Sequence, residues 1–187
     1  MKKILVLALF LVLPFYSYSQ SKLEIEERIE KSKVPLLAQK FIDSLDFSSQ
    51  VKWFVEQDFT KKTYEAKIKE KGKKYSIEFD SLGNIEDIEV EIEWNQIPLS
   101  TQNAICEKLT TDFEKFKIKR IQIQYSGKSS DLPNFEVNTE NLISRYEIVL
   151  KGKKQSKTSS YEYLFSEKGV VEEEMQIEFR NTDNIEY

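Results

Sequence analysis

Apolar and polar residues alternate in short runs along most of the chain, the pattern of strands with one dry and one wet face. In the first half, the apolar positions of four runs are Val51-Trp53-Val55, Tyr64-Ala66-Ile68, Tyr75-Ile77-Phe79 and Ile88-Val90-Ile92. Four further runs lie near residues 117–125, 143–151, 158–165 and 170–180. Turn residues at Lys71-Gly72 and Leu82-Gly83-Asn84 predict tight hairpins. The pattern therefore predicts antiparallel meanders.

A helix is predicted before each set of four strands. Pro35 and Pro98 suit a first helical turn and favour an extended residue before them. The predicted buried stripes are Leu37, Ala38, Phe41, Ile42 and Leu45 in the first helix, and Ile105, Leu109, Phe113 and Phe116 in the second. Cys106 lies beside the second stripe, and we expect it to be buried.

The two halves repeat one plan. Tyr75 to Ile85 matches Tyr161 to Val171 at an offset of 86, Tyr64 to Lys69 matches Tyr146 to Lys151 at 82, and Val34-Pro35 matches Ile97-Pro98 at 63. Beyond the glycines, apolar positions match at an offset of 87, which predicts a β-bulge near residues 172–174. A polar insertion at 126–141 and a longer loop at 152–157 distinguish the second half.

These features predict an α+β fold. Two tandem units, each a helix followed by a four-stranded antiparallel meander, form one extended antiparallel sheet with the helices on one face. The predicted boundaries are 34–94 for the first unit and 95–187 for the second. Residues 20–33 precede them as a charged segment, interpreted as a short strand or a frayed helix.

Residues 1–19 are predicted to be a secretory signal peptide. Lys2 and Lys3 precede an apolar run of ten residues, which is too short to span a bilayer about 30 Å thick as a helix. Small residues at Ser17 and Ser19 predict cleavage before Gln20. We therefore expect a periplasmic or secreted mature protein without a membrane span.

Composition excludes several kinds of chemistry. The chain of 187 residues has no His and one Cys, which excludes Ser-His catalysis, His-ligated zinc and an intrachain disulfide. Its formal charge of −4 argues against a nucleic-acid partner. The five glycines form no phosphate-binding loop. We accordingly expect no cofactor and no enzymatic activity.

The segment YEAKIKEKGKKYSIEFDSLGNIEDIEVEIEW, after a helix that begins with an apolar residue and Pro, resembles the PepSY-like family of Bacteroidetes secreted proteins, also described as β-lactamase-inhibitor-like. The resemblance covers about Val34 to Arg180 and is weaker in the second half. It implies tandem helix-plus-meander units and a secreted binding protein that uses the concave sheet face and its loops. No residue specifies a β-lactamase as the target.

Three candidate sites have simple structural explanations. Asp80, Asn84, Glu86 and Asp87 offer oxygen ligands for Ca²⁺, but a hairpin turn explains them better, and no metal site is predicted. Glu89, Glu91 and Glu93 are predicted to be solvated acids that meet Lys52, Lys67 and Lys69 on neighbouring strands of a flat meander. Trp53 and Trp94 are predicted core residues.

The predicted function is recognition of a protein or peptide partner through the exposed sheet face. The predicted contact residues are Phe54, Glu56, Glu65, Lys67, Glu78 and Glu91, with Phe54 as an exposed aromatic residue or one packed under a loop. The alternative is a structural or sensory envelope protein that binds small ions or peptides. A hydrolase that uses carboxylates alone is a third hypothesis, and open edge strands would allow a homodimer.

Overall fold

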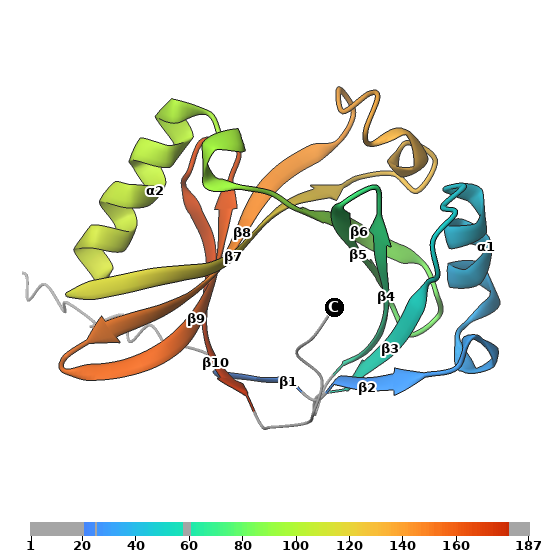
Figure 1. Ribbon diagram of the computed structural model, residues 1–187, viewed down its shortest axis with the longest axis horizontal. Helices are drawn as coiled ribbons and strands as arrows, with labels where there is room; N and C mark the ends of the chain where they lie inside the picture. The colour runs from blue at the N-terminus through green and yellow to red at the C-terminus, as the bar shows by residue number, and fades with distance from the viewer. Residues whose placement is uncertain (1–20, 25, 58–60, 180–187) are drawn as a thin grey trace, which may run out of the picture.

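One ten-stranded sheet forms the body of the protein (Figure 1). The computed structural model describes residues 21–24, 26–57 and 61–179, so the predicted signal peptide lies outside the described residues. The strand order is β1-β10-β9-β8-β7-β6-β5-β4-β3-β2. Adjacent strands pair antiparallel except β1 and β10, which pair in parallel. The predicted α+β class and the single sheet are confirmed.

The eight predicted strands are all present. In the first half they are β3 (Lys52–Gln57), β4 (Lys62–Glu70), β5 (Lys73–Phe79) and β6 (Ile85–Glu91). In the second half they are β7 (Lys115–Ser126), β8 (Ile143–Lys154), β9 (Lys157–Ser166) and β10 (Val171–Phe179). The alternating pattern was sufficient to predict them because each strand has one face against a core.

The helices α1 (Leu36–Ser44) and α2 (Leu99–Asp112) lie on the outer, convex face of the sheet (Figure 1). Each follows directly on a proline, and the residue before that proline is extended, as predicted. Ala38 and Ile42 of α1 are buried against the first half of the sheet, and Ile105 and Leu109 of α2 against the second. The helices therefore hold two apolar cores on one face, and the inner, concave face carries mostly polar residues from β3 to β7.

Two residues of the predicted helical stripes are exposed. Leu37 has 54% of its surface accessible, and Cys106 is also exposed. Both lie one residue beside the stripe, where the helix turns away from the sheet. The prediction that they are buried was wrong. The placement of Phe116 in the second helix was also wrong, because α2 ends at Asp112 and Phe116 lies in β7 (Lys115–Ser126).

The segment before α1 forms two strands that close the curved sheet. β1 (Ser21–Glu24) pairs with β10, and β2 (Glu26–Ile29) pairs with β3. Figure 1 shows these two strands end to end along the bottom of the ring-like sheet. Of the two interpretations of this segment, the strand was the correct one, because both edges of the sheet offered free backbone groups to pair with.

The predicted bulge in β10 is present, and β6 has the same one. Val171 pairs with Phe165 and Glu173 with Leu164, so Glu172 has no residue opposite it on β9. In the same way, Ile85 pairs with Phe79 and Asp87 with Glu78, so Glu86 has no residue opposite it on β5. The equivalent positions therefore keep an offset of 86, and the offset of 87 was wrong. As a result, Met175 and Ile177 pair with inner-face residues of β9 instead of facing α2.

The predicted long loop in the second half is a two-residue turn. β8 continues to Lys154 and β9 begins at Lys157, with Gln155 and Ser156 both at positive φ. This is the geometry of Lys71 and Gly72 in the first half. The additional residues lengthen the strands, because a tight turn keeps their backbone groups paired.

The insertion between β7 and β8 packs on the first half of the protein. It contains the 3₁₀ helix η3 (Leu132–Asn134), and Leu132 and Phe135 are buried in the core that α1 covers. Tyr75 of β5 donates a hydrogen bond of 2.8 Å to Glu136 of this segment. The insertion therefore ties the two halves together. Among the described residues, no helix is long and apolar enough to cross a membrane.

Candidate functional site

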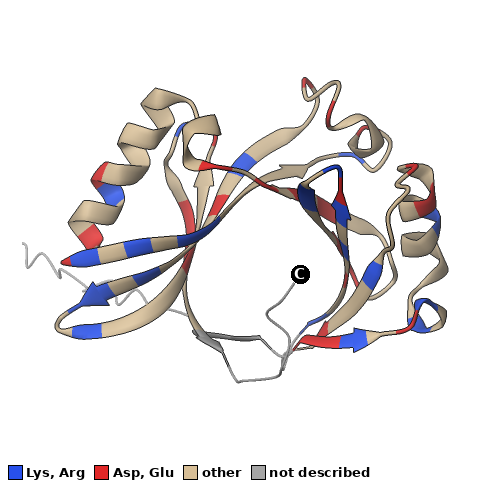
Figure 2. Ribbon diagram, viewed as in Figure 1, with Lys and Arg blue, Asp and Glu red and all other residues tan. Residues whose placement is uncertain are grey.

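The inner face of the sheet carries charged and amide side chains in rows that cross several strands. One row runs Phe54, Glu65, Glu78, Asp87; the next runs Lys52, Lys67, Ser76, Glu89, Gln124, Arg145; a third runs Lys74, Glu91, Gln122, Glu147. Figure 2 shows both signs of charge on these strands. Residues that pair across a sheet are neighbours on one face, so the rows form a continuous polar surface.

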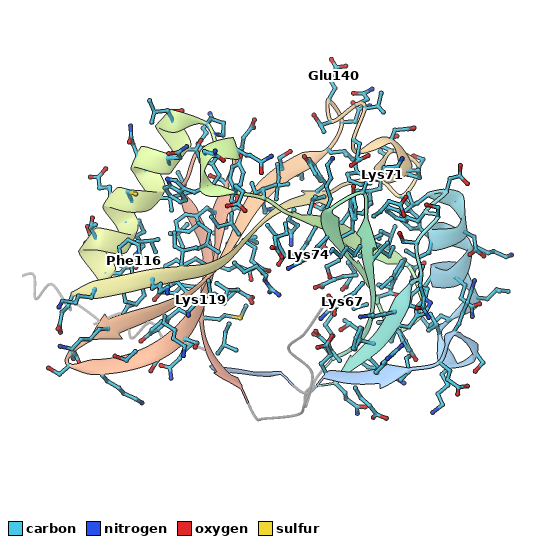
Figure 3. The ribbon with its side chains drawn as sticks, in the orientation of Figure 1. Lys67, Lys71, Lys74, Phe116, Lys119 and Glu140 are labelled. Carbon is cyan, nitrogen blue, oxygen red and sulfur yellow. The ribbon has the colours of Figure 1, made fainter. Side chains whose placement is uncertain are left out.

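All six predicted contact residues lie on this inner face, which follows from their shared place in the alternating pattern. Glu56, Lys67, Glu78 and Glu91 are half-buried. Lys67 and Lys74 point to the inner side of β4 and β5 (Figure 3). The predicted exposure was wrong for Glu65, which is 7% exposed, and Phe54 is also buried, at 8%. The curvature of the sheet brings facing side chains together and covers them.

Phe54 serves as a platform for Lys67. The ammonium of Lys67 lies 4.8 Å from the centre of the Phe54 ring, a cation–π geometry. Of the two expectations for Phe54, the packed one is correct, and its cover is a lysine of the neighbouring strand. Trp53 is 4% exposed in the first core and Trp94 packs against the second, as predicted.

The first group of acids is built around one lysine. Carboxylate oxygens of Glu26, Glu56 and Glu65 lie within 4.8 Å of one another. The ammonium of Lys67 is 2.5 Å from Glu26 Oε1 and 3.2 Å from Glu65 Oε2, and the Ser76 hydroxyl donates to Glu65. Burial and the nearby Glu65 carboxylate raise the pKa of Glu26 to about 7. The ammonium of Lys67 thus offsets part of the negative charge of these three carboxylates.

The second group is held by amides instead. Oxygens of Glu78, Asp87 and Glu89 also lie within 4.8 Å of one another. Gln122 Nε2 donates to Glu89 at 2.9 Å, and Gln124 Nε2 donates to Asp87 at 3.2 Å. Gln122 is 2% exposed, and within the described part of the chain its Oε1 accepts no hydrogen bond. These oxygens are of the type that Ca²⁺ prefers.

Burial dominates the electrostatics of this second group. It raises the pKa of Asp87 to about 7, with a further contribution from the Glu147 carboxylate. Burial and the same Glu147 also raise the pKa of Glu89 well above its usual range, while Arg120 opposes the shift. The crowded acids attract protons, metal ions or the cationic side chains of a partner.

The expectation of solvated acids that pair with Lys52, Lys67 and Lys69 was therefore wrong. Glu89 is 4% exposed and binds Gln122, while Glu91 pairs with Lys74 at 3.1 Å. Glu93 lies beyond β6 and caps the 3₁₀ helix η2 (Trp94–Gln96). The lysines expected opposite these acids are on strands further away, because the meander places β5 and β7 beside β6.

Residues 80–84 form a hairpin turn between β5 and β6, as the structural explanation of this segment predicted. Asp80 accepts hydrogen bonds from the backbone of Leu82 and Asn84 and from the Asn84 side chain. Gly83 has φ +88° and packs on the start of α1. Of the four candidate ligands, only Asp87, which lies in β6, joins the inner-face acids.

The sequence did not point to Gln122, Arg120 or Glu147 as members of the site. They lie in the second half, and they meet β6 because β7 follows it in the sheet. Arg120 Nη2 donates to Glu147 at 3.1 Å. A usable signal was the polar alternation of Arg120, Gln122 and Gln124 within a run whose other positions are apolar.

The protein is similar to known proteins in its structure and not in its sequence. No protein-family model matches the chain, and no curated protein matches it in sequence. The structure is similar to a DUF2874 family protein from Bacteroides ovatus (TM-score 0.51, 13% identity, 76% of this chain and 87% of that chain). It is also similar to a protein from Bacteroides eggerthii provisionally described as periplasmic (TM-score 0.51, 14% identity, 76% and 88%).

A BLIP-like protein from Bacteroides fragilis has a TM-score of 0.47 at 18% identity, over 82% of this chain and 92% of that chain. At such identities, similarity between structures is a statement about fold and leaves function to the residues of the site. The chain therefore has the α+β fold, one curved sheet with two helices, of the DUF2874 family protein from Bacteroides ovatus.

Proposed function

We propose that the protein is a non-enzymatic periplasmic or secreted binding protein that recognises a protein or peptide partner through the inner face of its sheet. The observation that carries the proposal is the division of the sheet's two faces: both helices cover the outer face, and the inner face from β3 to β7 is polar and charged apart from Phe54. Small ligands favour deep, mostly apolar pockets, so this face suits a polypeptide better.

The chemistry of the inner-face residues supports binding over catalysis. Ser76, hydrogen-bonded to Glu65, is 2% exposed and so out of reach of a substrate. Asp87 and Glu89 are engaged with the amides of Gln124 and Gln122. The periplasmic description of the Bacteroides eggerthii protein supports the same compartment for this chain.

We also infer that the protein arose by duplication of one PepSY-like unit, with residues 34–94 and 95–187 as the two copies. Repeated details support this. Gly83 and Gly169 form the same turn, and Gln39 and Gln102 each donate to the carbonyl two residues before their helix. The matching bulges of β6 and β10 add a third detail.

Replacement of Glu91 by Lys should reduce partner capture at least tenfold. Glu91 is half-buried at the inner face and pairs with Lys74, so the change reverses a charge that a partner would meet, and about 1.4 kcal/mol is a factor of ten. The measurement is capture of an envelope protein by the immobilised chain, followed by its affinity as a purified component.

Glu107→Lys on α2 is the matched control, since Glu107 is exposed on the outer side of the molecule. It should capture as much partner as the unchanged protein. Thermal unfolding of both variants separates lost recognition from lost folding. Equal capture by Glu91→Lys would remove the inner face from consideration.

The alternative, an envelope protein that binds small ions, is favoured by one observation. The oxygens of Glu78, Asp87 and Glu89 lie close together, and Gln122 Oε1 accepts no hydrogen bond from any residue that the structure describes. If it holds, CaCl₂ should raise the unfolding midpoint saturably at pH 7.5, because a ligand stabilises the state it binds. Glu89→Gln should abolish the rise and Glu56→Gln should keep it. An unchanged midpoint in millimolar CaCl₂ would reject this function.

A further inference from the structure

A lysine-rich area lies at one end of the inner face. It comprises Lys115 and Lys117 of β7 and Lys151 and Lys153 of β8. Figure 2 shows this basic end where β7, β8 and β9 extend beneath the C-terminal end of α2. These four lysines share the face of Glu147: Lys151 and Lys153 lie at alternate positions from Glu147 on β8, and Lys117 and Lys115 pair directly opposite them on β7. The inner face is thus acidic at its centre and basic at this end.

Lysines lie directly opposite lysines in this area. Lys115 pairs with Lys153, and Lys117 pairs with Lys151. Like charges in directly opposed positions destabilise a sheet. The folded chain alone therefore gives no reason for this arrangement, and it lies in a protein whose formal charge is −4.

The basic end also differs from the rest of the inner face in its ion pairs. Lys67 and Lys74, near the centre, are each paired with an acid. At the basic end, Lys153 pairs with Glu114 at 3.0 Å. Lys115, Lys117 and Lys151 make no ion pair with any residue that the structure describes, and all three are exposed. Three ammonium groups are therefore available to an external anion.

The spacing of these lysines matches an extended peptide. Alternate residues of a strand repeat every 6.5–7 Å on one face, so two rows of lysines follow the strand direction at that interval. Alternate side chains of an extended ligand repeat at the same distance. On β9, Ser160 is opposite Lys151 and Thr158 is opposite Lys153, which adds hydroxyl donors to the same face.

We propose that the basic end, formed by Lys115, Lys117, Lys151 and Lys153, binds an acidic segment of the partner in extended conformation, with carboxylates at alternate positions. This rests on the proposed function and assigns one part of the partner's chemistry. A phosphate polymer is the other anion that such lysines attract, but its charges do not require the strand-like interval.

The test uses the full chain and a fluorescein-labelled (Glu-Ser)₅ peptide, with fluorescence anisotropy at 50 mM salt. We expect micromolar binding that weakens about tenfold in Lys117→Gln/Lys151→Gln, and that falls steeply towards 300 mM salt because exposed charges are screened. The double variant should fold at least as well as the unchanged protein, because it removes one of the two opposed lysine pairs.

Lys128→Gln/Lys168→Gln is the matched control. It removes the same charge from exposed loop positions away from the basic end, and it should bind the peptide as the unchanged protein does. Equal affinity of the two double variants would overturn the proposal. Equal affinity for Glu₅Ser₅, which has the same charge in one block, or tenfold tighter binding of polyphosphate, would also overturn it.

These outcomes are distinct from failure of the proposed function. If the peptide does not bind while Glu91→Lys still abolishes partner capture, the inner face recognises its partner without an acidic segment. If the peptide binds through the lysines and no envelope partner is captured, the basic end exists but the wider function fails.

Discussion

Between pH 5 and pH 8, we expect the free energy of unfolding to fall by about 3 to 5 kcal/mol. The folded-state pKa of Asp87 and of Glu26 is about 7, and that of Glu89 is also raised. An acid whose pKa is higher in the folded state binds more protons there, so stability decreases as pH rises from the unfolded-state pKa to the folded-state one. One pKa unit corresponds to about 1.4 kcal/mol. The acids repel one another, so part of the loss falls above pH 8.

Between pH 5 and pH 8, the change in the free energy of unfolding comes mainly from the buried acids. The chain has no His. The acids whose pKa is lowered, such as Glu70 and Asp80, are ionised in both states above pH 5, and their contribution is lost only in stronger acid. Urea unfolding at fixed salt and with a chelator, in steps of half a pH unit, measures the slope.

Glu89→Gln should reduce this slope by the contribution of Glu89 and stabilise the protein at pH 8, since a neutral amide replaces a buried charge of similar shape. Glu91→Gln is the control: its half-exposed carboxylate pairs with Lys74, and the slope should persist. A free energy of unfolding that rises between pH 5 and 8 would contradict the buried position of these acids.

Gly83→Ala should destabilise the protein by about 2 to 4 kcal/mol. Gly83 has φ +88°, a conformation that costs other residues about 1–2 kcal/mol. A Cβ atom there would lie 2.7 Å from the Cβ of Pro35 and 3.0 Å from the backbone nitrogen of Ala38, so α1 would have to move away from the turn. Overpacking of this kind adds about 1–3 kcal/mol.

Gly72→Ala separates the two contributions. Gly72 has φ +84°, but a Cβ atom there would have no neighbour within 4 Å, so only the strain applies. Gly169→Ala, where the added Cβ would lie 2.8 Å from that of Ala104, should resemble Gly83→Ala. Equal losses for Gly72→Ala and Gly83→Ala, measured by urea unfolding, would show that the turn does not support the helix.

The sequence was sufficient to predict the strands and helices, because their patterns depend on residues close together in the chain. Alternation predicted β3 to β10, and the prolines predicted the starts of α1 and α2, because each depends on neighbours within a few residues. Long-range consequences were not accessible. The burial of Glu89 and Phe54 depends on the curvature of the sheet, and Gln122 reaches Glu89 only because β7 lies beside β6. The fold was thus more predictable than the chemistry of its inner face.

The closure of the sheet by β1 and β2 has a consequence for the order of folding. Ser21 pairs with Gln176, so the first described strand gains its partner only after the last strand has formed. Such distant contacts slow folding, because the chain loses conformational entropy when a large loop closes, before the new contacts stabilise the fold. We therefore expect the meanders to assemble early and the seam between the chain's two ends to form last, so that the inner face acquires its final shape in the concluding step.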